Sequence, residues 1–222
     1  MSPSNYCINY AHSNAYCKGH QANQLGLKTV CCFSFLKILT NNFKPVIWVL
    51  CVSRVSMQLE LLSKDHLEQL LAFELENRSW FESLIEPRDD DFYSAQGVER
   101  HIDVELEKVS SGSSFCGLLF KNNEIVARAN LRDIGTNRAF VGYRVSKRFI
   151  SQGYASFCLA SLIEIAKREY NVQSLGAKVL ENNPASKHVL LKQGFEVIGD
   201  VPSFITINNT QLACTEFRLT YA

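Results

Sequence analysis

The pattern of apolar and polar residues predicts a strand and a helix directly after Met57. Residues 58–62 alternate between polar and apolar side chains, which is typical of a strand. Ser63 follows and can accept a hydrogen bond from the first turn of a helix. The leucines of that helix recur every three or four positions and therefore share one face: Leu67, Leu70, Leu71 and Leu75.

A second amphipathic helix is predicted after a link. The link, residues 77–93, is polar and contains several aromatic residues. Ser94 then offers another N-cap, and the helix is expected to end near Lys108. Its apolar residues are spaced by four: Val98, Ile102 and Leu106.

Four apolar stretches are expected to form two antiparallel hairpins. The segment between the members of each pair contains two adjacent asparagines, which tolerate the positive φ of a tight turn. These turns are Asn122–Asn123 and Asn208–Asn209. The strands that they join are 115–120, 125–134, 195–201 and 212–221.

Between the two hairpins the sequence predicts a parallel pair of strands. A strand at 140–146 leads into a helix at 153–169 and then into a strand at 174–180, an order that pairs in parallel with a right-handed crossover. A short helix follows, with Asn183–Pro184 at its start and Gly194 at its end. The whole order predicts an α+β fold with a mixed, mainly antiparallel sheet flanked by helices.

Composition separates the first quarter of the chain from the rest. Of the 222 residues, 46% are hydrophobic and 20% are charged, and the net charge of +1 gives no case for a nucleic-acid partner. Residues 1–56 hold five basic and no acidic residues, whereas residues 57–222 hold 18 basic and 22 acidic residues, a net charge of −4. The second part has three scattered cysteines, which suits a reducing, cytoplasmic compartment.

Residues 1–56 are interpreted as a leader of doubtful order. Their most apolar run, 45–52, is too short to span a membrane and comes late for a secretory signal, so no membrane partner is expected. A transit peptide fits poorly, because the segment is poor in arginine. We favour a translation start at Met57, which leaves a single domain, 57–222, as the native protein.

The stretch Ser151-Gln152-Gly153-Tyr154-Ala155 is a candidate anion site. It leads from a strand into a helix, so the N–H groups of the first helical turn, which lack intrahelical partners, point to one place. The glycine permits close approach of a ligand, and Lys147 and Arg148 can add positive charge. By itself, a glycine before a helix is more often a simple turn.

A second candidate stretch lies on the short helix. Asn183 and Ser186 open this helix, and Gly194-Phe195 closes it. Each has an ordinary structural explanation, as a cap, a first-turn residue or a helix stop. Ligands of open sheets bind at the carboxyl ends of parallel strands, however, and both candidate stretches are expected there.

Together these stretches resemble the GCN5-related N-acetyltransferase (GNAT) superfamily. The acetyl-CoA loop of that family reads Gln/Arg-x-x-Gly-x-Gly/Ala, and residues 150–155 match it except at Ile150, which removes a side-chain donor. Residues 181–186 and 192–195 are similar to the Asn-x-x-Ser…Gly-Phe segment of the ribosomal-protein-alanine (RimJ/RimL-like) branch. The resemblance covers 57–222 and is supported by three further stretches: 76–81, 86–93 and 137–145.

The resemblance implies acetyl-CoA as co-substrate, bound where strands 140–146 and 174–180 separate, and no metal. It implies that strand-edge backbone holds the pantetheine and that an N–H near Val145 stabilises the oxyanion of the thioester. The residues implied to bind the cofactor are Val145, Ser146, Gln152, Gly153, Tyr154, Ala155 and Asn183.

The implied reaction is direct attack of an amine on the thioester. Ser186 is the implied proton donor to the thiolate, because the tyrosine that many relatives carry four residues later is Leu190 here. The base is left open between Tyr143, Asp133 and solvent, since an α-amine with a pKa near 8 demands little. The favoured acceptor is a protein N-terminal α-amine. A small-molecule amine, or a non-catalytic acyl-CoA sensor, is the alternative.

Other reactive side chains are expected to be structural. Cys158 has no histidine nearby to activate it and is expected to pack in a helix. His101 and His188 are expected at exposed helix positions without a partner at metal-ligand spacing, so no metal site is predicted. The sequence gives no indication of the oligomeric state.

Overall fold

The computed structural model describes residues 57–207 and 210–221. The predicted leader and the predicted Asn208–Asn209 turn lie outside these residues. The strands are β1 (Leu59–Leu61), β2 (Phe115–Lys121), β3 (Glu124–Arg132), β4 (Arg138–Val145), β5 (Ser174–Leu180), β6 (Glu196–Ile207) and β7 (Thr210–Thr220). The helices are α1 (Leu67–Glu76), α2 (Arg78–Glu82), α3 (Ala95–Ser110), α4 (Tyr154–Arg168) and α5 (Pro184–Lys192), with short 3₁₀ turns at Lys64–His66, Asp90–Tyr93 and Lys147–Phe149.

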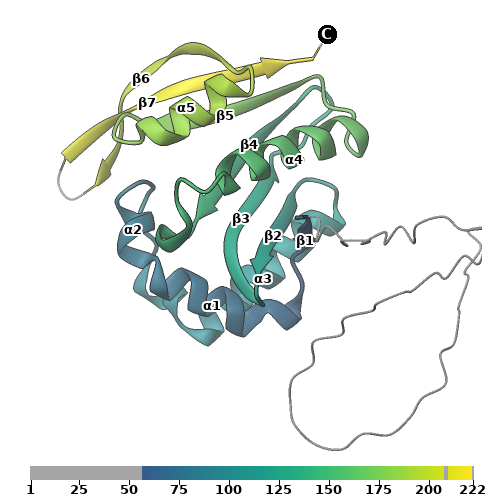
Figure 1. The fold of residues 1–222 in the computed structure, drawn as a ribbon, viewed down its shortest axis with the longest axis vertical. Coiled ribbons are helices and arrows are strands. Elements are labelled where there is room, and N and C mark those ends of the chain that lie inside the picture. The colour runs from purple at the N-terminus through teal and green to yellow at the C-terminus, as the bar shows by residue number, and fades with distance from the viewer. Residues whose placement is uncertain (1–56, 208–209, 222) are drawn as a thin grey trace, which may run out of the picture. The chain divides into compact units, whose positions relative to one another are not determined.

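The seven strands form one sheet in the order β1-β2-β3-β4-β5-β7-β6 (Figure 1). All neighbouring strands are antiparallel except β4 and β5, which are parallel. This confirms the predicted α+β class and the single parallel pair. No helix of the described residues is long and apolar enough to cross a bilayer.

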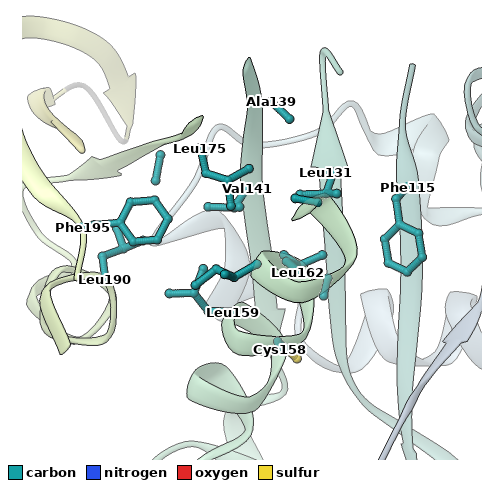
Figure 2. Close-up of a cluster of buried hydrophobic side chains, with 14 of the residues drawn as sticks. Phe115, Leu131, Ala139, Val141, Cys158, Leu159, Leu162, Leu175, Leu190 and Phe195 are labelled. Atoms are coloured by element: carbon teal, nitrogen blue, oxygen red, sulfur yellow. The ribbon is translucent and has the colours of Figure 1, made fainter. Parts of the chain in front are cut away.

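Helices cover both faces of the sheet. On one face α4 packs on β3 and β4, and its inward residues Leu159 and Leu162 lie against Val141 and Leu131 (Figure 2). On the other face α1 and α3 enclose a second buried cluster that includes Leu70 and Ile102. The apolar spacing of these helices therefore predicted their buried sides.

The parallel pairing of β4 with β5 is short, and the opening beyond it forms the candidate site. β4 and β5 are in register only at Arg138–Ser174, Ala139–Leu175 and Phe140–Gly176, although both strands continue further. At the last pair the ring of Phe140 lies over Gly176, where an added Cβ would come within 2.7 Å of the ring. Beyond this point the two strands diverge (Figure 1).

Local signals in the sequence placed most element ends correctly. The Ser94 hydroxyl accepts a hydrogen bond from the Gly97 N–H at 3.0 Å and so caps α3. Asn122 and Asn123 have φ values of 51° and 64°, and Gly194 has a φ of 85° after α5. These positive values are the ones that the turn and helix-stop predictions require.

Three expectations were wrong in part. The predicted link 77–93 contains helix α2 and the Asp90–Tyr93 turn, because Arg78 and Glu82 form an ion pair one helical turn apart, 2.9 Å. Leu75 is 48% exposed rather than on the buried face of α1. Strand β6 continues to Ile207, six residues beyond the predicted end at residue 201, with irregular pairing to β7 on the way.

Candidate active site

The start of α4 offers free backbone donors. Gly153 is the N-cap with a φ of 86°, and no side chain caps this helix, unlike α3 and α5. A Cβ built on Gly153 would meet nothing within 4 Å, so glycine is required for its φ and the space beside it is open. The N–H groups of Tyr154 and Ala155 in the first turn therefore face an anion-binding position, where the helix dipole also favours negative charge.

The side chains around this turn contribute less than expected. The Gln152 amide donates to the Arg148 carbonyl at 3.2 Å, and Ile150 is 44% exposed. Arg148 forms ion pairs with Glu76, at 3.4 Å, and with Glu124. The expected charge from Arg148 is thus shared with two carboxylates, and backbone groups are the main donors.

Tyr143 on β4 and Ser186 on α5 meet across the divergence of β4 and β5. Their hydroxyl oxygens are 3.0 Å apart, and both side chains are half-buried. Burial raises the pKa of Tyr143 above its ordinary value of 10, so the phenol keeps its proton at neutral pH. The two predicted catalytic residues therefore form one hydroxyl pair, in which either hydroxyl can donate, and the protonated phenol of Tyr143 is unsuited to act as a base.

The peptide groups of β4 add donors at the same place. The Ser146 N–H donates to the Val126 carbonyl of the β3 side at 2.9 Å. Since peptide groups alternate between the two sides of a strand, the N–H groups of Tyr143 and Val145 point away from β3, toward the side that β5 has left. These N–H groups are available to a ligand between the strands.

Ser146 itself carries an unsatisfied polar atom. The residue is 1% exposed, and its Oγ has no hydrogen-bond partner among the described residues. A buried hydroxyl without a partner is costly, so it marks a place where a partner is expected. Ser146 directly follows β4, next to the free N–H of Val145.

Helix α2, which the sequence analysis missed, closes the end of this region. The Trp80 indole donates to the Val145 carbonyl at 3.3 Å, and Asn182 donates its side-chain amide to the Ser83 carbonyl at 2.8 Å. These contacts join the segment around α2 to both β4 and the loop before α5. The position of Trp80 was not predicted, because residues 77–93 were expected to form a link. Only the spacing of Arg78 and Glu82 indicated a helix there.

Asn183 caps a helix, and Asp133 lies away from the hydroxyl pair. The Asn183 side-chain oxygen accepts from the Ser186 N–H at 3.1 Å and caps α5, which is its structural explanation. Asp133 is exposed in the loop before β4, beside Arg132, the partner of Phe140. Tyr143 lies three residues further along β4, about 10 Å from that pair. Asp133 is not brought to the hydroxyl pair.

A buried network of charged side chains lies between the sheet and helices α1 and α3, and the sequence did not predict it. Arg128 is 3% exposed and lies 3.4 Å from Glu74, which also binds Arg144 at 2.9 Å. Arg128 also lies 2.7 Å from Nε2 of His101. His101 is half-buried instead of exposed, which corrects the prediction, and burial followed by the charge of Arg128 lowers its pKa to about 2. His188 is exposed as predicted.

The buried thiol on α4 is structural. Cys158 is 0% exposed, and burial raises the pKa of its thiol to about 12. It is therefore protonated at neutral pH and packs in the core (Figure 2), as predicted. Among the described residues, no three His, Cys, Asp or Glu side chains gather as metal ligands would.

Known proteins are similar to this chain in sequence or in fold. The chain is 25% identical over 146 residues to the probable N-acetyltransferase YjcK of Bacillus subtilis (strain 168), covering 64% of this chain and 81% of the relative. Its fold is similar to that of the ribosomal α-N-protein acetyltransferase RimL in complex with coenzyme A, with a TM-score of 0.69, 20% identity, and coverage of 75% of this chain and 94% of RimL. It is also similar to the microcin C7 self-immunity acetyltransferase MccE in complex with acetyl-CoA and AMP, with a TM-score of 0.68, 14% identity, and coverage of 76% and 94%.

The family follows from a more direct match. The model of the acetyltransferase (GNAT) domain family matches residues 57–196, which is more than half of the chain and includes β4, the loop before α4 and α5. This agrees with the resemblance seen in the sequence and with the diverging parallel strands. The chain belongs to the acetyltransferase (GNAT) family.

Proposed function

We propose that this protein transfers an acetyl group from acetyl-CoA to the N-terminal α-amine of a protein, by direct attack in a ternary complex. The observation that carries the proposal is the set of unused donors where β4 and β5 diverge. The N–H groups of Tyr143 and Val145 and the uncapped start of α4 all lack partners that a bound acyl-CoA would supply.

These groups suit the parts of acetyl-CoA. The first turn of α4, with Gly153 at its N-cap, would hold the pyrophosphate through backbone N–H groups, and Ile150 would add none. The strand-edge N–H groups would bind the pantetheine, with that of Val145 positioned for the thioester oxygen. The similarity of the fold to RimL with coenzyme A and to MccE with acetyl-CoA supports this placement.

The chemistry needs little from the side chains. The neutral amine attacks the thioester carbonyl, a C–N bond forms, and the C–S bond breaks as the tetrahedral intermediate collapses. The thiolate takes a proton from Ser186, Ser186 regains one from Tyr143 through the hydrogen bond between the two hydroxyls, and Tyr143 is reprotonated by solvent. The ammonium proton leaves to solvent, because the described residues near the hydroxyl pair offer no ionised base.

Acceptor assays test the proposal. Peptides that begin with Ala or Ser are incubated with acetyl-CoA beside a panel of polyamines, amino acids and aminoglycosides, and both free thiol and product mass are followed. The proposal predicts one acetyl group on the peptide α-amine and none on the small amines. Acetylation of the small amines alone would favour the first alternative, and tight acyl-CoA binding without turnover on any amine would favour the sensor.

Two further proposals concern the native chain. We propose that residues 57–222 form the acetyltransferase domain and that the protein acts in the cytoplasm. The intact mass of the natively expressed protein tests the start at Met57, since a mass that corresponds to all 222 residues would contradict it.

A further inference from the structure

Three arginines gather on the face of the sheet opposite α4, and they are called here the arginine patch: Arg132, Arg138 and Arg218. The strand register places them on one face of the sheet, with Arg132 and Arg218 three strands, or about 14 Å, apart. Arg132 is opposite Phe140, Phe140 is opposite Gly176, and Gly176 is opposite Arg218, so these residues form one row across four strands. Arg138 is two residues before Phe140 and therefore points to the same face.

Two of the three arginines border a hollow in the surface. Arg138 and Arg218 line a depression of about 640 Å³, together with Ser174, Thr220 and Phe140. The ring of Phe140 covers Gly176, and the guanidinium of Arg138 is 4.8 Å from the centre of that ring. Glycine at position 176 therefore leaves room for the Phe140 ring, which lines the hollow.

The positive charges of the patch are only partly compensated. All three arginines are exposed and form no ion pair in the part of the chain that the structure describes, whereas five other arginines do: Arg78, Arg100, Arg128, Arg144 and Arg148. Two carboxylates are near the patch, Asp133 in the hollow and Glu196 opposite Arg218. Three positive charges against two negative ones leave a local surplus on a domain whose net charge is −4.

The position of the patch relates it to the acceptor. Phe140 and Gly176 form the last parallel pair, where the opening between β4 and β5 begins. Along β4 the Cα atom of Tyr143 is about 10 Å from that of Phe140 and about 17 Å from that of Arg138. The Tyr143 side chain points to the α4 face, so a peptide on the patch would reach the hydroxyl pair through the opening between β4 and β5. An extended peptide covers this distance in about three to five residues.

We propose that the arginine patch binds acidic side chains that lie about three to five residues behind the acceptor's N-terminus. The proposal rests on the proposed function and narrows it, because it selects protein N-termini with an acidic segment from all α-amines. A nucleic acid is disfavoured as the occupant, since the acidic surface around so small a patch would repel a long polyanion.

The test compares two peptides that begin with the same three residues, one with Asp and Glu at positions four to six and one with Asn and Gln there. We expect the double variant Arg138→Gln/Arg218→Gln to raise KM for the acidic peptide roughly threefold to tenfold, since each exposed ion pair contributes little, and to leave kcat unchanged. KM for the neutral peptide stays the same in this variant. Arg168→Gln, at an exposed position of α4 on the other face, is the control and changes neither value.

A second measurement separates this inference from the proposed function. The acidic peptide, blocked by N-acetylation and carrying a fluorophore, is titrated with protein, and its anisotropy is followed at low and high salt. Weaker binding by the double variant supports docking of the acidic segment. This holds even if no peptide is acetylated, because a lack of acetylation would contradict only the proposed function. Equal affinity for blocked acidic and neutral peptides, or a single-stranded RNA oligonucleotide that binds more tightly than either, would overturn the inference.

Discussion

The hydroxyl oxygens of Tyr143 and Ser186 lie 3.0 Å apart, although the two residues are 43 positions apart in the chain. The contact joins β4 to α5 across the place where β4 and β5 separate. It brings a phenol whose pKa is raised by burial next to a hydroxyl at the start of a helix. The arrangement suits delivery of a proton to a leaving group better than removal of one from an amine.

Ser186→Ala is expected to lower kcat about 100-fold and to leave KM for acetyl-CoA nearly unchanged, since general acid catalysis contributes at least about that factor. The Asn183 cap survives, because it uses the backbone N–H of residue 186. Tyr143→Phe should cost less, about tenfold, and the double variant should cost no more than Ser186→Ala alone. Steady-state kinetics check this, and independent, multiplying effects would contradict a shared path for the proton.

Gly153→Ala is expected to raise KM for acetyl-CoA at least tenfold, because the new methyl group would occupy the open space beside the α4 N–H groups. Gly112→Ala is a matched control, since Gly112 also has a positive φ, of 73°, and open space around it. Both variants should lose about 1 kcal/mol of unfolding free energy through backbone strain. If both raised KM equally, the loop would have no special relation to the cofactor.

Ile150→Gln is expected to lower KM for acetyl-CoA roughly threefold to tenfold, because it adds one hydrogen-bond donor worth about 1 kcal/mol at the pyrophosphate position. Ile150 is 44% exposed, so the polar side chain should not disturb the core. Ile150→Leu, which adds no donor, serves as the comparison in the same acetyl-CoA titration. An unchanged KM for the glutamine variant would place the pyrophosphate elsewhere.

Stability should fall in mild acid because of His101. Its pKa is about 2 in the folded protein, mainly through burial, against an ordinary 6.5 in the unfolded chain. The unfolded state therefore takes up a proton first. The contribution of His101 to the free energy of unfolding is complete above pH 6.5. Below that pH it declines by about 1.4 kcal/mol per pH unit. Urea unfolding at pH 7, 6 and 5 should show this slope in the wild type and a flatter one in His101→Gln. Identical slopes would contradict the burial of a neutral imidazole.

Much of the fold follows from local signals in the sequence. Ser94, the Asn122–Asn123 pair and Gly194 each act through neighbours within a few residues, and the turn or cap that each predicts is present. Helix α2 was missed because five residues are too few to show an amphipathic period.

The side-chain partners in the site could not be predicted in the same way. The ion pairs of Arg148 and the burial of His101 depend on residues that are distant in sequence and meet only through the packing of α1 and α3 on the sheet. The same holds for the contact between Tyr143 and Ser186, which depends on where the parallel pairing stops.

Amide hydrogen exchange with and without acetyl-CoA would show whether the cofactor binds to backbone N–H groups between β4 and β5 and at the start of α4. We expect slower exchange at Tyr143, Val145 and residues 153–155 when acetyl-CoA is present, with no change in the hairpin of β2 and β3 around Asn122–Asn123. Unchanged exchange at these amides under conditions in which acetyl-CoA demonstrably binds would contradict this expectation.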